Sequence, residues 1–63
     1  MTLLPRERQV LECAQSGQSC KETARTLGIA SNTVRVYRAN AMRKFGTSRI
    51  VVAVLGARER GLI

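Results

Sequence analysis

The chain has no histidine, no aspartate and no tryptophan, and its 63 residues include only two cysteines, one proline and four acidic residues, all glutamate. Without His or Asp, and without a glycine-rich loop to cradle a phosphate, the usual catalytic acids, bases and phosphate sites are missing. Two cysteines without histidine cannot supply the four ligands of a structural zinc site. We therefore predict that the chain is no enzyme and holds no metal, cofactor or small-molecule ligand.

Long apolar runs are also absent. No stretch reaches the ~20 apolar residues of a membrane span, and the first residues lack the charged-then-apolar layout of a secretory signal. We expect a soluble cytoplasmic protein that meets no membrane and keeps Cys13 and Cys20 as thiols. No linker rich in Pro, Gly or Ser divides the sequence, so residues 1–63 are interpreted as a single domain.

Positive charge is what the chain has in excess. Eleven Lys and Arg face four Glu, which gives a formal net charge of +7 and an isoelectric point near 11.2. This imbalance predicts a polyanionic partner, most simply nucleic acid. The alternative is a surface charged only for solubility, but an excess of cations this large is unusual for that purpose.

The segment 31–45 has the spacing of an amphipathic helix. On a helical wheel Tyr37, Ala41 and Phe45 fall within about 60° of Val34, which predicts a stripe that faces the core. The opposite side has no carboxylate and suits an anionic partner; it presents Asn32, Arg35, Val36, Ala39, Asn40 and Arg43. We interpret this segment as a recognition helix for the major groove of DNA.

Three glycines predict the turns between helices. We expect Ser31 to cap the segment 31–45 and Gly46 to end it. Before it, a first helix is predicted from Pro5 to about residue 16, ended by Gly17. Ser19 and Glu22 match a capping box for a second helix over 20–27. The short turn through Gly28 to the next helix is typical of a helix-turn-helix.

A fourth helix is predicted after Gly46, capped by Thr47 or Ser48 and ending near Arg60. Residues 50–55 are apolar on all sides, so one face must meet a partner. A strand is the alternative, but the chain offers no second strand to pair with it.

We expect the exposed face of this helix to form a homodimer contact, since small symmetric oligomers are common. The alternative is that it packs against a regulatory domain outside the chain. The candidate interface residues are Val51, Val54, Leu55 and Arg58. The tail 61–63 should pack back on the domain.

Four short motifs carry a family resemblance. They are Leu3-x-Pro5-Arg6-Glu7-Arg8-x-Val10-Leu11, Lys21-Glu22-x-Ala24-x-x-Leu27-Gly28-Ile29, Thr33-Val34-Arg35-Val36 and Arg43-Lys44-Phe45-Gly46. In this order and at these intervals the chain resembles the LuxR/GerE-type helix-turn-helix domain of bacterial transcription regulators. The resemblance implies an all-α, tetrahelical, LuxR C-terminal-like fold whose third helix enters the major groove and whose fourth forms a homodimer. Leu4 and Thr23 depart from the family pattern, which prefers a capping Thr and a core aliphatic there.

The resemblance and the helical wheel together assign candidate DNA contacts. Arg35 can give two hydrogen bonds to guanine, with a phosphate contact or a solvated side chain as the alternatives, and Val36 can meet a thymine methyl. Arg38 lies about 40° from the core axis, so we assign it to phosphate. The candidate base contacts are Arg35, Val36, Asn32 and Ala39. The candidate phosphate contacts are Lys21, Thr33, Arg38, Asn40, Arg43 and Lys44.

The sequence thus predicts sequence-specific binding of double-stranded DNA for transcription regulation, at the nucleoid of a bacterium, with RNA polymerase as a further candidate partner. One alternative is a protein-interaction module that pairs with a related helix-turn-helix regulator and inhibits it. Another is a promoter-recognition domain of the sigma-factor type. An inhibitor of the first kind would have no need of Arg35.

Overall fold

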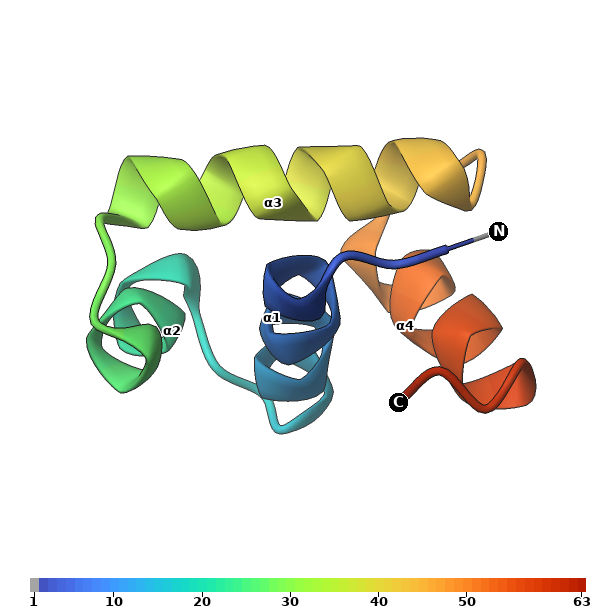
Figure 1. Cartoon of the computed structure of the whole chain (residues 1–63), viewed down its shortest axis with the longest axis horizontal. Coiled ribbons are helices and arrows are strands. Elements are labelled where there is room, and N and C mark those ends of the chain that lie inside the picture. Colours follow the sequence, from blue (N-terminus) through green and yellow to red (C-terminus); the bar gives the residue numbers. More distant parts are fainter. Residues whose placement is uncertain (1) are drawn as a thin grey trace.

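A computed structural model describes residues 2–63, and this part of the chain holds four helices and no strand. The helices are α1 (Pro5–Gln15), α2 (Cys20–Leu27), α3 (Ser31–Lys44) and α4 (Ile50–Glu59). In Figure 1, α3 is a long rod along one side of the molecule, and α1 lies between α2 and α4 on the other side. The predicted all-α, four-helix fold is confirmed. None of these helices has the length and apolar content that a bilayer crossing requires.

The start of α2 forms as predicted. The Ser19 hydroxyl accepts a hydrogen bond from the Glu22 N–H over 3.2 Å, and Glu22 Oε1 accepts one from the Ser19 N–H over 2.8 Å. These reciprocal bonds satisfy two backbone donors at the helix start. The helix ends at Gly28, whose φ of 69° is the left-handed conformation that glycine adopts without steric cost.

Two predicted helix caps are wrong. Ala30, not Ser31, occupies the cap position of α3, so Ser31 is already helical and no side chain caps this end. At α4 the cap residue is Arg49, and neither Thr47 nor Ser48 caps the helix. The Thr47 hydroxyl instead accepts from the Arg49 N–H over 3.1 Å within the turn. Helix α3 therefore begins one residue earlier than the cap chemistry suggested, and α4 begins one or two residues later.

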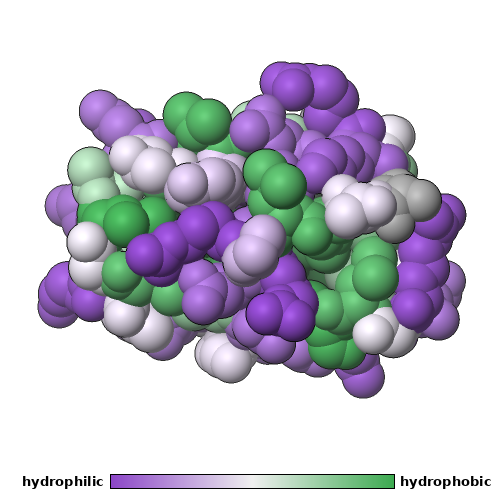
Figure 2. All heavy atoms as spheres, in the orientation of Figure 1, coloured by the Kyte–Doolittle hydropathy of each residue, from purple (hydrophilic) through white to green (hydrophobic). Residues whose placement is uncertain are grey.

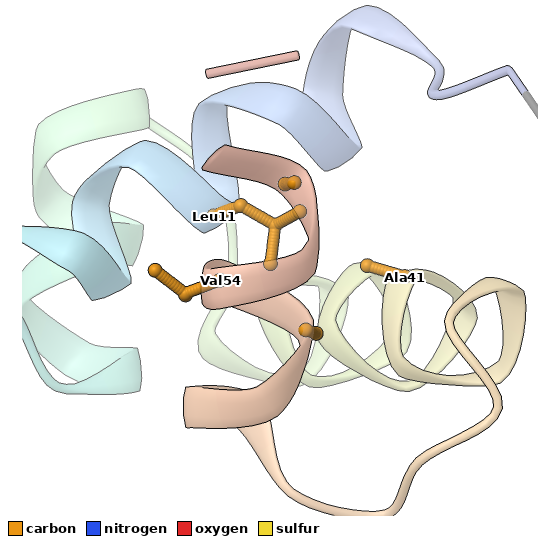
Figure 3. Close-up of a cluster of buried hydrophobic side chains, with 5 residues drawn as sticks. Leu11, Ala41 and Val54 are labelled. Atoms are coloured by element: carbon orange, nitrogen blue, oxygen red, sulfur yellow. The ribbon is translucent and has the colours of Figure 1, made fainter. Parts of the chain in front are cut away.

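The hydrophobic core has two clusters, one on each side of α1. The larger cluster joins α1, α3 and α4, and Figure 3 shows Leu11, Ala41 and Val54, one from each of these helices, within it. The smaller cluster joins α1, α2 and α3 through Val10, Ala24 and Val34. The predicted stripe on α3 is therefore confirmed, and it leaves the opposite side of α3 to solvent.

The C-terminal tail packs back as predicted. Leu62 and Ile63 contact the larger core cluster, and the Leu62 N–H donates to the Ala57 carbonyl over 2.8 Å. This contact holds the end of the chain against α4. It adds apolar surface to a core whose five buried members include three alanines.

Candidate nucleic-acid interface

The exposed side of α3 is a stripe of side chains without a carboxylate. Val34 and Ala41 are fully buried, which fixes the rotation of the helix about its axis. The stripe that this rotation exposes consists of Asn32, Arg35, Val36, Ala39 and Arg43. Their spacing of three, four, seven and eleven residues from the first places them in one row along the helix. Figure 2 shows mainly hydrophilic side chains along the edge formed by α3, interrupted by hydrophobic atoms.

All four predicted base-contacting residues lie on this stripe. Arg35, Asn32 and Ala39 are exposed, and Val36 is 57% exposed although it is apolar. Arg35 has no hydrogen-bond acceptor and no acidic partner within residues 2–63. An exposed guanidinium beside an exposed aliphatic residue can offer both a hydrogen-bonding fork and an apolar contact to one groove. The structure thus brings together the side chains that the sequence analysis singled out.

Four of the predicted phosphate contacts, Lys21, Thr33, Asn40 and Arg43, make no side-chain hydrogen bond or ion pair to another helix within residues 2–63. Lys21 is exposed in the first turn of α2, and Thr33 is half-buried in the first turn of α3. Arg43 Nη1 donates to Asn40 Oδ1 over 3.1 Å on the exposed surface of α3. This bond orients the Arg43 guanidinium while leaving its other donors available.

Arg38 is placed differently from these four residues. Its side chain is half-buried, and Nη2 donates to the backbone carbonyl of Gln18, in the turn between α1 and α2, over 3.0 Å. Its Nε is buried and has no hydrogen-bond partner in the described part of the chain. The predicted position of Arg38 close to the core-facing side of α3 is confirmed. Its guanidinium bonds to the turn between α1 and α2 and does not extend into solvent.

Lys44 is engaged in an ion pair that the sequence analysis missed. Its ammonium donates to Oε1 of Glu7 in α1, and also to the carbonyl of Thr2 over 2.9 Å. Glu7 is only 1% exposed. Burial raises the pKa of Glu7, but the hydrogen bonds from Lys44 and from the Leu4 N–H outweigh burial and hold that pKa below its ordinary value. The spacing of Glu7 from Val10 and Leu11, three and four residues, places it on the core face and could have revealed this.

The outer face of α4 is apolar. Val51 is 58% exposed, Leu55 is 49% exposed, and Arg58 is also exposed. These three residues line a groove of about 200 Å³ whose other side is formed by the end of α1. Val54, the fourth predicted interface residue, reaches the same groove but is only 8% exposed and belongs to the larger core cluster. Its main role is therefore in the core.

The sequence over residues 1–57 matches the family model for bacterial regulatory proteins of the luxR family. The chain belongs to this family. The predicted membership of this family and the predicted helix-turn-helix fold are thereby confirmed. The four helices described above are those of a luxR-family domain. The order of the four sequence motifs was thus sufficient to identify the family.

Curated relatives of this luxR-family chain are transcriptional regulatory proteins. It is 57% identical over 42 residues to FixJ of Azorhizobium caulinodans, a match that covers 67% of the chain and 20% of FixJ. It is 49% identical over 49 residues to UhpA of Escherichia coli, covering 78% of the chain and 25% of UhpA. It is 38% identical over 61 residues to MctR of Rhizobium johnstonii, covering 97% of the chain and 28% of MctR. The chain therefore spans less than a third of the length of these relatives.

Proposed function

We propose that the chain binds double-stranded DNA in a sequence-specific manner and thereby regulates transcription, with the exposed side of α3 in the major groove. The observation that carries this proposal is the row of exposed side chains on α3, cationic and amide groups with no carboxylate, on a chain of net charge +7. Membership of a family of bacterial regulatory proteins supports it. We place this activity in the bacterial cytoplasm, at the nucleoid, and a contact with RNA polymerase stays a prediction.

The proposed base contacts follow from the chemistry of the exposed row. Arg35 would donate two hydrogen bonds to O6 and N7 of a guanine, which discriminates against other bases by ~1–3 kcal/mol. Asn32 can pair with an adenine in the same bidentate way, and Val36 and Ala39 can contact thymine methyl groups. The small side chain of Ala39 also allows the helix backbone to approach the groove floor closely.

The proposed phosphate contacts are Lys21 and Arg43, which are exposed, and Thr33 and Asn40, which are half-buried. None of the four side chains bonds to another helix within residues 2–63. Phosphate contacts fix the position and register of a protein on the duplex, and sequence is read by the base contacts. We leave Lys44 and Arg38 out of this group because their donors are used within the protein. A contact by either residue would cost the intramolecular bonds described above.

We further propose that two copies pair through the outer face of α4. A lone domain reads only a few base pairs, and pairing on a site of matching two-fold symmetry multiplies its specificity. Val51, Leu55 and Arg58 would form the centre of this contact, since an exposed apolar groove on so small a domain favours a partner. The second candidate function, inhibition of a related regulator by pairing with it, would use this same face of α4. It would leave the cationic row on α3 without a role.

The experiment that tests the proposed function is selection of bound sequences from random duplex DNA, followed by affinity measurements over a range of salt. We expect a consensus site and a slope of log affinity against log salt of about 3 to 4 per copy, because each phosphate contact contributes about 0.9. Arg35→Ala should abolish the preference for that consensus while weaker, non-selective binding persists. A chain that binds no duplex at low salt, or binds with an affinity independent of salt, would disprove the proposal.

A further inference from the structure

Gln18, in the turn between α1 and α2, is held by hydrogen bonds to three helices. Its N–H donates to the Cys13 carbonyl of α1 over 3.1 Å, and its Oε1 lies 3.2 Å from the Thr26 hydroxyl of α2, whose single proton is shared with the Glu22 carbonyl at 3.0 Å. Its carbonyl accepts from Nη2 of Arg38, in the middle of α3, over 3.0 Å. One turn residue therefore connects the start of α2 to both α1 and α3.

The side chain of Arg38 is committed to this contact. Its bond to Gln18 joins residues 20 positions apart in the sequence and is partly buried. Its Nε is out of contact with solvent and lacks a partner in residues 2–63. A buried donor without a partner lowers the free energy of unfolding. The Gln18 bond and the packing of the stem must therefore outweigh this cost. Swinging out toward a phosphate would give up the Gln18 bond and the packing of the stem.

The bond from Arg38 acts on the part of α2 that carries Lys21. Gln18 is followed directly by Ser19, whose capping bonds with Glu22 begin the helix. Lys21 is exposed in this first turn. The position of Lys21 relative to the exposed row of α3 is therefore linked to Arg38 through these hydrogen bonds, in addition to the packing of α2 on α3 in the smaller core cluster.

We propose that Arg38 is a positioning residue for DNA binding: by holding the Gln18 turn it sets the first turn of α2 so that Lys21 meets the phosphate backbone while α3 occupies the groove. This inference rests on the proposed function. It assigns to Arg38 an indirect role in place of the direct phosphate contact that the sequence predicts. A rigid helix pair is needed because a phosphate contact on one helix and base contacts on another must be made together.

The test is a double-mutant cycle between Arg38→Met and Lys21→Ala, measured as affinity for a short mixed-sequence duplex over a range of salt. Methionine keeps the apolar stem and removes the charge, all donors and the unpartnered Nε. Since each phosphate contact contributes about 0.9 to the salt slope, we expect each single variant to lower the slope by about 0.9. The double variant should lower it by about 0.9 as well, because Arg38→Met has already displaced Lys21. A fall of about 1.8 in the double variant would mean two independent contacts and would overturn the inference.

Arg43→Met is the matched control, because Arg43 is an exposed arginine of α3 and a proposed direct contact. Combined with Lys21→Ala it should lower the slope additively. If Arg38→Met does not fold, Thr26→Val serves in the same cycle, since it removes another bond to Gln18 without changing the charge. This variant should reduce the effect of Lys21→Ala, and an undiminished effect would contradict the inference.

A second measurement needs no DNA. Arg38→Met should speed hydrogen exchange at the Glu22 and Thr23 amides, which bond to Ser19, and Arg43→Met should not. Unchanged exchange at these amides in Arg38→Met would also overturn the inference. A wild-type chain without affinity for any duplex would disprove the proposed function and the inference with it. Additive slopes in a chain that binds would disprove the inference alone.

Discussion

Nζ of Lys44, in the last turn of α3, lies 2.5 Å from Oε1 of Glu7, in the first turn of α1, and the carboxylate is almost completely buried. The pair joins helices whose residues are 37 positions apart in the sequence. Glu7 Oε1 also accepts a hydrogen bond from one backbone donor at the start of α1, the Leu4 N–H, over 2.9 Å. The Leu4 side chain has no oxygen that could cap the helix, and Glu7 bonds to both the start of α1 and the end of α3.

Acid should destabilise the protein through Glu7. The pKa of this carboxyl in the folded state lies below its ordinary value of 4.5, so the ionised Glu7 stabilises the fold above that pH. This contribution is lost as the pH falls from about 4.5 through the folded-state pKa, because the unfolded chain then binds the extra proton. Urea denaturation at a series of pH values should show the loss, and Glu7→Gln should show a smaller dependence on pH in that window. An unchanged dependence in Glu7→Gln would contradict this assignment.

Replacing Lys44 should lower the free energy of unfolding more than neutralising Glu7 does. Lys44→Met leaves the Glu7 carboxylate buried and unpaired, and we expect a loss of about 1–3 kcal/mol in the free energy of unfolding at neutral pH. The loss should shrink in acid, because burial alone raises the pKa of Glu7 and the carboxyl can then become neutral. Lys21→Met, at an exposed lysine, is the matched control and should change stability little. Equal stability of both variants at all pH values would show that the pair contributes nothing.

Thr23→Val should stabilise the protein. Thr23 is fully buried and its hydroxyl has no hydrogen-bond partner in the described part of the chain. Valine has nearly the same shape, and removing an unsatisfied buried hydroxyl should gain about 1 kcal/mol, or ~4–8 °C in the melting temperature of so small a domain. Thr26→Val is the control, because the Thr26 hydroxyl lies within hydrogen-bonding distance of Gln18 and of the Glu22 carbonyl. A melting temperature that falls in Thr23→Val would show that the hydroxyl has a partner in solution.

The fold and the exposed row of α3 could be predicted from the sequence because both depend on local patterns. The capping box at Ser19 and the spacing of Val34 and Ala41 are readable without knowing any neighbouring element. The positions of Arg38 and Lys44 could not be predicted in the same way. Their partners lie 20 and 37 residues away in the sequence, and a wheel shows where a side chain leaves its helix but not what it meets. For these long cationic side chains, the partner within the protein therefore had to come from the structure.

Gly56→Ala should destabilise the protein even though alanine favours helices by about 1 kcal/mol over glycine. A Cβ at Gly56, in the middle of α4, would lie 2.8 Å from Cδ1 of Phe45. The Phe45 ring packs against the larger core cluster and has the Arg60 guanidinium over it, 5.7 Å from the ring centroid, so it is confined on both sides. Overpacking of this kind costs ~1–3 kcal/mol. Chemical denaturation should give a lower midpoint, and Phe45→Leu should cost less in the Gly56→Ala background than in the wild type.

Leu55→Lys should weaken self-association and, with it, binding to a site of two-fold symmetry. Leu55 is 49% exposed and lines the groove between α1 and α4, so a lysine there would place two like charges across a symmetric contact. Because Leu55 is outside the larger core cluster, the monomer should remain folded. Sedimentation should show the loss of dimer, and affinity for a single half-site should change little. Val52→Lys is the matched control, since Val52 is 41% exposed on α4 but does not line the groove. A wild-type chain that stays monomeric at high concentration would contradict the dimer. Equal effects of the two substitutions would show that the groove lined by Leu55 is not the dimer contact.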